Sequence, residues 1–349
     1  MTPVELSRTV LCAVRHAVDA GELSVAVPAR AVVSVPGAGG TGDYATNIAL
    51  QLARPAGRTP RYVAEVLRER ISGAPGVRDV EITGPGFLNI SLDSAAPAAL
   101  VREIRTQGLR YGHSDALAGQ VLELRLPGRS EPRADAVAEA VTRIVATQGG
   151  RVRVRVQRGG GEPQGTVDIL IPDVPDVPDV LDLRTLPPAP ADPTPLGPDA
   201  ARWALLHPAP HDRPRLGPEH LVQRESNPLF RVRYAYARTR ALGRNAVDLG
   251  LTAHPGDLAD VTAAHPLLAT LADHPRLLLG AATHRAPDRL ARHLVTVADA
   301  TLAFVPTVLP IGDEKPSAAH RARLALAEAA GTVLAGGLSL LGIDAPEYL

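Results

Sequence analysis

Six arginines lie within 21 residues of the chain, where the only acid is Glu225. They are Arg224, Arg231, Arg233, Arg238, Arg240 and Arg244. Aromatic residues alternate with them, among them Tyr234. A guanidinium group binds phosphate through paired hydrogen bonds, and aromatic rings stack on unpaired bases. The segment therefore favours RNA binding, with the alternative that these arginines pair with acids on neighbouring helices.

Helical spacing divides the arginines into two stripes, because residues seven apart share a face. One stripe holds Arg224, Arg231 and Arg238 if the helix extends back that far. The other holds Arg233, Arg240 and Arg244, roughly 200° away. The apolar and aromatic residues between the stripes predict a helix packed on two sides. These residues are Leu229, Val232, Ala235 and Tyr236 on one side, and Phe230, Tyr234, Ala237 and Ala241 on the other.

Composition excludes several other kinds of chemistry. The chain has 349 residues, with 37 basic and 37 acidic ones, so a uniformly basic nucleic-acid coat is excluded. Lys315 is the only lysine, and Cys12 is the only cysteine, which excludes an intramolecular disulfide and a cysteine-rich zinc site. The 11 histidines show no metal-binding spacing, so we expect no metal site and no cofactor.

Hydropathy predicts a soluble cytoplasmic protein. The first residues carry Glu5 and Arg8 and no long apolar run, so no secretory signal is expected. No stretch of 18 uncharged apolar residues occurs, so we expect no membrane span.

Periodicity and proline content divide the chain into four parts. We expect an α+β N-terminal domain over residues 1–115, a degenerate α/β segment over 118–172, a proline-rich linker over 173–198 and an all-α helical bundle over 199–349. The linker contains an Asp-Val-Pro repeat and then six further prolines, which predicts an extended chain that pairs poorly in a sheet.

The expected elements follow from the spacing of apolar residues. In the first part they are helices over 3–20, 43–55, 60–73 and 95–108, and strands over 77–83 and 87–92. In the second they are a strand over 121–126, a helix over 135–148, a strand over 152–156 and a third strand over 166–171.

Two separated segments resemble one family, the arginyl-tRNA synthetases of class I. Residues 42–53, Pro60-Arg61 and residues 84–90 resemble the family's N-terminal additional domain. Residues 227–238 resemble the opening of its helical anticodon-binding domain, of the DALR type. Shorter similarities lie at 196–203 and 340–347, so the resemblance covers roughly 1–115 and 196–349.

The resemblance implies roles for individual residues. Asp43, Tyr44 and Asn47 fall in the motif of the domain that contacts the tRNA elbow, although Asp43 could instead cap the following helix. The nucleic-acid-binding residues it implies, together with the arginine cluster, are Arg224, Asn227, Arg231, Arg233, Tyr234, Arg238 and Arg240. Arg233 and Tyr236 stand where the family commonly has Gln and His, so specificity for one anticodon is in doubt.

The catalytic signatures of the family are not found in the sequence. The chain has no His-x-Gly-His, and its one lysine excludes a Lys-Met-Ser-Lys-Ser loop. Only about 80 residues separate the two similar regions, too few for a class I catalytic domain. The middle segment therefore resembles a relic of a Rossmann fold. These absences predict a non-catalytic synthetase-like protein, a pseudoenzyme, whose partner is tRNA.

Three alternatives stay open at this point. The arginine-rich helix could serve duplex DNA, in which case binding would depend strongly on salt. The former RNA surface could contact a protein partner, which would make the chain an interaction scaffold. An enzyme that uses charged tRNA as its substrate is the third alternative.

Overall fold

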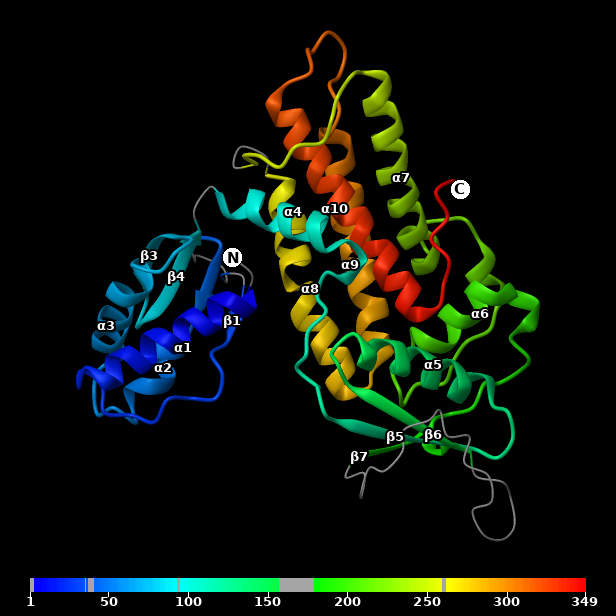
Figure 1. The fold of residues 1–349 in the computed structure, drawn as a ribbon, viewed down its shortest axis with the longest axis horizontal. Coiled ribbons are helices and arrows are strands. Elements are labelled where there is room, and N and C mark those ends of the chain that lie inside the picture. Colours follow the sequence, from blue (N-terminus) through cyan, green and yellow to red (C-terminus); the bar gives the residue numbers. More distant parts are fainter. Residues whose placement is uncertain (1–2, 35, 37–40, 93–94, 157–178, 259–261) are drawn as a thin grey trace. The chain divides into compact units, whose positions relative to one another are not determined.

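The computed structural model describes residues 3–34, 36, 41–92, 95–156, 179–258 and 262–349. These residues form two compact units (Figure 1). The first unit runs to Arg102 and includes His254–Asp273, and the second comprises Glu103–Ala253 and His274–Leu349. The strand expected over 166–171 lies outside the described residues. The domain limits inferred from the sequence stay predictions.

The first unit is an α+β fold with a four-stranded antiparallel sheet, in the order β1-β2-β4-β3. Its elements are α1 (Pro3–Asp19), β1 (Val33–Ser34), β2 (Tyr44–Thr46), α2 (Ile48–Ala53), α3 (Pro60–Ser72), β3 (Val77–Thr83) and β4 (Phe87–Leu92). The helix expected over 43–55 is shorter, because Tyr44–Thr46 pair with β4 as a strand. On α1 the apolar residues Leu6, Val10 and Val14 recur at helical spacing and are fully buried.

A glycine fixes the approach of β2 to its partner strand. Gly42 has a φ of 81°, and a Cβ atom there would lie 2.9 Å from the carbonyl oxygen of Ile90. Only glycine combines this left-handed backbone with so close a contact. The backbone N–H of the next residue, Asp43, then donates to the same carbonyl at 2.9 Å.

The second unit is mainly a helical bundle. Its helices are α5 (Pro132–Ala146), α6 (Gly197–Leu206), α7 (Pro228–Asp248), α9 (Pro287–Phe304) and α10 (Ala318–Leu341), while α4 (Ala95–Gln107) and α8 (Ala264–His284) have residues in both units. Short 3-10 turns are η1 (Gly108–Arg110), η2 (Leu183–Thr185), η3 (Thr194–Leu196), η4 (Pro218–Leu221) and η5 (Val305–Thr307). Helices α7, α9 and α10 pack on one another. Small residues of α10 permit this, since a Cβ atom at Gly337 would lie 3.0 Å from Cγ of Leu294 on α9.

Helix α10 is the one described helix that is long and apolar enough to cross a membrane. However, 67% of its apolar stretch is buried inside the protein. Buried residues cover most of the helix surface, and a stripe that includes Arg321, Glu328, Thr332 and Ser339 is not buried.

A small parallel sheet accompanies the bundle in the second unit. Its strands are β5 (Val121–Leu126), β6 (Arg151–Val156) and β7 (Asp179–Asp182), in the order β6-β5-β7. Helix α5 connects β5 to β6, which gives the β-α-β unit predicted from the sequence. Strand β7 was not predicted, because residues 173–198 were interpreted as an unpaired linker. Residues 179–182 pair with β5 because this stretch of the proline-rich segment contains no proline.

Candidate nucleic-acid interface

Asn227 determines where α7 begins. Its side-chain oxygen accepts hydrogen bonds from the backbone N–H groups of Leu229 (3.1 Å) and Phe230 (3.5 Å). Its amide donates to the carbonyls of His220 (2.9 Å) and Val222 (3.0 Å). The side chain is thus a buried N-cap that also ties down the preceding loop. The observed contacts give Asn227 a structural role and leave it no free polar group for RNA.

The first arginine stripe is shorter than the spacing suggested. Because the helix starts at Pro228, Arg224 lies in the preceding loop and not on α7. Arg231 is half-buried, and its guanidinium pairs with Asp299 of α9 at 3.0 Å. Arg238 is exposed, and no partner for it lies among the residues that the structure describes. Of the three arginines, only Arg238 is both on the helix and available.

Phe230, Tyr234 and Arg238 follow one another at intervals of four residues and share one face of α7. The rings of Phe230 and Tyr234 stack, with centroids 5.6 Å apart and planes 12° apart. Tyr234 is 39% exposed. The expectation of a helix packed on two sides holds for Ala237, which is buried, but not for Tyr234, whose ring leaves an accessible aromatic surface.

The second arginine stripe binds the last residues of the chain. Arg233 donates to the carbonyl oxygen of Asp344 (3.0 Å) and pairs with the Asp199 carboxylate. Arg240 pairs with Glu347 at 3.0 Å. The guanidinium of Arg244 lies 4.2 Å from the ring centroid of Tyr348, a cation–π contact. Three arginines on one side of α7 thus hold residues 344–348 along the helix.

The arginine cluster was interpreted either as an RNA-binding surface or as a set of ion pairs within the protein, and the observed contacts differ from one arginine to the next. Arg231 and Arg233 pair with acids of neighbouring helices, as the alternative interpretation expected, whereas Arg240 pairs with an acid of the chain end. The pairs of Arg231 and Arg240 are partly exposed, so each is worth less than about 1 kcal/mol and can exchange an acid for a phosphate.

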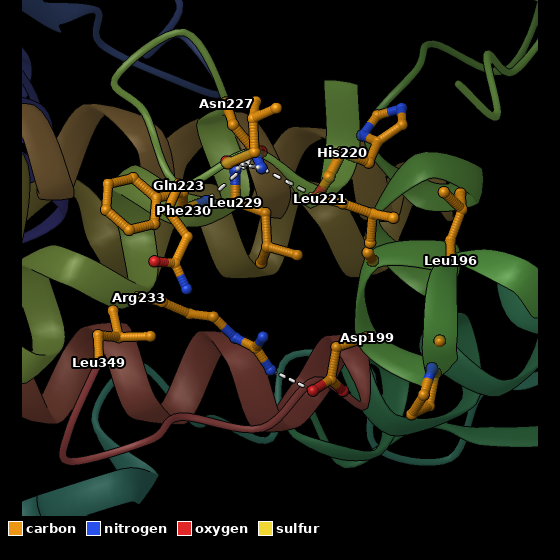
Figure 2. A pocket seen from close by; sticks show the side chains of 14 residues that line it. Leu196, Asp199, His220, Leu221, Gln223, Asn227, Leu229, Phe230, Arg233 and Leu349 are labelled. Atoms are coloured by element: carbon orange, nitrogen blue, oxygen red, sulfur yellow. Dashed lines mark hydrogen bonds and ion pairs between the residues drawn. The ribbon is translucent and has the colours of Figure 1, made fainter. Parts of the chain in front are cut away.

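A cavity of about 270 Å³ lies beside the start of α7 (Figure 2). Its walls come from the N-terminus of α6, the loop around η4, the first turns of α7 and the last residue of the chain. Arg233 and Asp199 form one side of the cavity, and Leu349 lies near Arg233 (Figure 2). Phe230, which stacks on Tyr234, lies at the edge of the cavity. The cavity thus combines apolar walls with amide, guanidinium and carboxylate groups, a lining suited to a planar polar group such as a base.

The three predicted tRNA-elbow residues lie at β2 of the first unit. The Asp43 carboxylate accepts the backbone N–H of Leu92 at 2.7 Å, so it joins two strands and does not cap a helix. Tyr44 is buried in the sheet, and this burial is the main cause that raises its pKa to about 12. Asn47 is exposed and accepts a hydrogen bond from Gln51 at 2.8 Å. Contact of these residues with tRNA stays a prediction.

Sequence reasoning missed Phe230, Gln223 and Leu349 as members of the site. Phe230 was assigned to a packed side, although its spacing of four residues from Tyr234 was a usable signal. Gln223 and Leu349 had no local signal, because only the tertiary fold brings the loop and the chain end to α7.

Comparisons with known proteins match both ends of the chain. The DALR anticodon binding domain matches residues 232–349, and the arginyl tRNA synthetase N terminal domain matches residues 6–92. The chain is 45% identical over 163 residues to an arginine–tRNA ligase of Renibacterium salmoninarum, a match that covers 44% of this chain and 30% of that ligase. It is also 26% identical to an arginine–tRNA ligase of Paenarthrobacter aurescens over 549 aligned positions that cover all of both chains.

Solved structures show the same fold. Arginyl-tRNA synthetase of Thermus thermophilus has a TM-score of 0.68 at 15% identity, with both chains fully covered. The enzyme of Plasmodium falciparum has a TM-score of 0.67 at 8% identity, with 99% of each chain covered. At these identities the similarity establishes the fold alone.

The expectation that the chain is not an enzyme is contradicted by these matches. It rested on motifs missing from the middle of the sequence, whereas the relatives, one of them aligned end to end, are named arginine–tRNA ligases, which are enzymes. The chain spans 30% of the first of these relatives, and 549 aligned positions against 349 residues show that long segments of the second have no counterpart here. With matching domains at both ends and a synthetase fold throughout, the chain is an arginyl-tRNA synthetase-like protein.

Proposed function

We propose that this protein binds tRNA and holds the anticodon loop against α7. The observation that carries the proposal is the stripe of Phe230, Tyr234 and Arg238 beside the cavity at the start of the helix. The match of the surrounding residues to the DALR anticodon binding domain supports the same assignment.

The chemistry of the stripe suits single-stranded RNA. An unpaired base can stack on the exposed ring of Tyr234, which Phe230 holds in place from one turn below. Arg238 follows one turn further along and is exposed, so it can pair with the backbone phosphate of a nucleotide stacked on Tyr234. Stacking needs a base that is out of a duplex, so a loop fits this surface better than double-stranded DNA does.

The cavity supplies hydrogen-bonding groups next to the stacking surface. Arg233 and Asp199 pair within its wall, which fixes the guanidinium in position before any ligand arrives. Gln223 of the loop adds an amide with both donor and acceptor atoms. A second base of the loop can therefore enter the cavity while its neighbour stacks on Tyr234.

Competition binding tests the proposal. Fluorescence anisotropy of a labelled tRNA-Arg transcript is measured at one physiological salt concentration, with unlabelled tRNA, an isolated anticodon stem-loop and random duplex DNA as competitors. The expected result is competition by tRNA and stem-loop at concentrations at least tenfold below that of duplex DNA. Equal or better competition by duplex DNA would contradict tRNA recognition.

A further inference from the structure

One face of the small parallel sheet carries a concentration of arginines that the site on α7 does not use. Side chains alternate along a strand, and β5 and β6 pair in register, so Arg125 lies opposite Arg155 and Glu123 opposite Arg153. Val121 pairs with Arg151 on the same face. Arg151, Arg153 and Arg155 therefore form a row along β6, spaced by about 6.6 Å.

The opposite face of the sheet packs on α5 (Figure 1). Leu122, Leu124 and Leu126 point to that side and are buried. Parallel sheets normally bury both faces beneath helices, and their strands are then apolar throughout. Here leucine alternates with charged residues on β5, so the second face of the sheet is polar.

A buried carboxylate fixes two of the arginines. Glu123 is only 3% exposed; one oxygen accepts the Nε–H of Arg125 (2.9 Å), and the other forms an ion pair with Arg155, whose Nε lies 3.0 Å away. Both arginine side chains are about half exposed. Each is held through Nε, which leaves the terminal N–H groups of the two guanidinium forks to bind an anion.

Among the residues that the structure describes, arginines outnumber acids on this face. Glu123 is shared by two arginines, and the carboxylate of Asp182, on β7, pairs with Arg184. Arg151 and Arg153 have no partner among the residues that the structure describes. Charge on an edge strand can serve to prevent strand-to-strand aggregation. That role explains charge on β6 but not a shared carboxylate that orients arginines from two strands.

We propose that Arg125, Arg151, Arg153 and Arg155 form a second RNA-binding surface, which contacts the phosphate backbone. The contact lies outside the anticodon-type site, and it rests on the proposed function only for the identity of the RNA as tRNA. A row of guanidinium groups along a strand matches the repeated phosphates of a backbone and reads no base, so it adds affinity without sequence preference.

The test uses the full chain and three probes: whole tRNA, its anticodon stem-loop, and the same tRNA without the anticodon arm. Anisotropy titrations over a range of NaCl concentrations compare wild type with Arg153→Gln and with the double variant R125Q/R155Q. The matched control is R289Q/R321Q, which removes two exposed arginines from α9 and α10. Arg153→Gln disturbs no contact among the described residues, so it keeps the test valid if the double variant, which leaves Glu123 unpaired, does not fold.

The expected result is a change confined to RNA outside the anticodon arm. For whole tRNA and for the tRNA without that arm, the salt slope falls by about 0.7 to 0.9 in Arg153→Gln and by about 1.4 to 1.8 in R125Q/R155Q. Binding of the stem-loop and of the control variant stays as in wild type. Sheet variants that bind every probe like the control would overturn the proposal. Competition by polyglutamate as strong as that by RNA would also overturn it, because the surface would then suit any acidic partner.

The two proposals fail separately in this experiment. If the wild-type protein does not bind the stem-loop, the site on α7 is contradicted. Binding of whole tRNA and of the tRNA without the anticodon arm still shows whether the sheet arginines contribute. If the wild-type protein binds the stem-loop and the sheet variants bind all probes like the control, only the proposal of the second surface is contradicted.

Discussion

Phe230 and Tyr234 stack one turn apart on α7, with ring centroids 5.6 Å apart and planes 12° apart. If Tyr234 supports an unpaired base, replacing its ring must weaken RNA binding. We expect Tyr234→Ala to raise the dissociation constant for the anticodon stem-loop about tenfold, since stacking of one base contributes about 1 to 3 kcal/mol. Anisotropy with a labelled stem-loop measures this change.

Tyr234→Phe is the matched control for that variant. It keeps the stacking surface and removes only the hydroxyl, so binding should stay within about twofold of wild type. Equal losses in the Phe and Ala variants would indicate a hydrogen bond from the hydroxyl in place of stacking. No loss in the Ala variant would contradict the role of the ring.

Releasing Arg240 from its acid should strengthen RNA binding. Glu347→Gln removes the partner of Arg240, whose pair is half exposed on both sides. We expect the salt slope for tRNA to rise by up to about 0.9, the contribution of one further phosphate contact. The exposed Asp115→Asn provides a variant with the same charge change at a site away from α7, and it should leave the slope unchanged. An identical effect of both substitutions would mean that only net charge matters.

The pattern of arginine and aromatic residues predicted that α7 carries the candidate RNA-binding site. It did not predict which side chains of α7 are exposed and unpaired. Helical periodicity depends on neighbours in sequence, and so it located the stripe of Arg233, Arg240 and Arg244 correctly. The partners of this stripe, Asp344, Glu347 and Tyr348, lie about a hundred residues away in sequence. Only tertiary packing decides that these arginines bind the chain end while Arg238 stays exposed.

We expect the free energy of unfolding of the second unit to decrease as the pH falls below neutral, because of His293. This side chain is buried in α9, and burial lowers its pKa from 6.5 to about 4. Between those values the unfolded chain binds a proton that the folded state does not, so stability decreases as pH falls through that range. The expected loss attributable to His293 is about 2 kcal/mol between pH 7.5 and pH 5.

Urea unfolding followed by far-UV circular dichroism measures this dependence. His293→Leu should lack that part of the pH dependence, whereas His211→Leu, at an exposed position, should keep it. An unchanged pH dependence in His293→Leu would show that another group is responsible.

Two adjacent glycines of α10 should respond oppositely to alanine. A Cβ atom at Gly337 would meet the buried Leu294 side chain, with Cγ at 3.0 Å, so Gly337→Ala should destabilise the bundle by about 1 to 3 kcal/mol. At Gly336 the nearest atom is 3.6 Å away, an ordinary contact, so Gly336→Ala should be neutral or stabilising by up to about 1 kcal/mol. Thermal melts of both variants give the comparison, and equal melting temperatures would contradict the close packing of α9 on α10.

The middle of the chain was the hardest part to predict. Alternation in Val121–Leu126 and in Arg151–Val156 was sufficient to identify both strands, because Leu122, Leu124 and Leu126 share one face with Val152, Val154 and Val156. Strand β7 was not predicted because its four residues carry little pattern of their own, and only pairing with β5 makes them a strand. The absence of short catalytic motifs likewise proved a poor basis for excluding enzymes, given an end-to-end match to a ligase.

Nuclease and chemical footprinting of bound tRNA locates the contact on the RNA and so tests whether α7 holds the anticodon loop. We expect the wild-type protein to protect the anticodon loop, and the double variant Y234A/R238Q to lose this protection. A bound tRNA whose anticodon loop stays as reactive as in the free RNA would contradict recognition by α7.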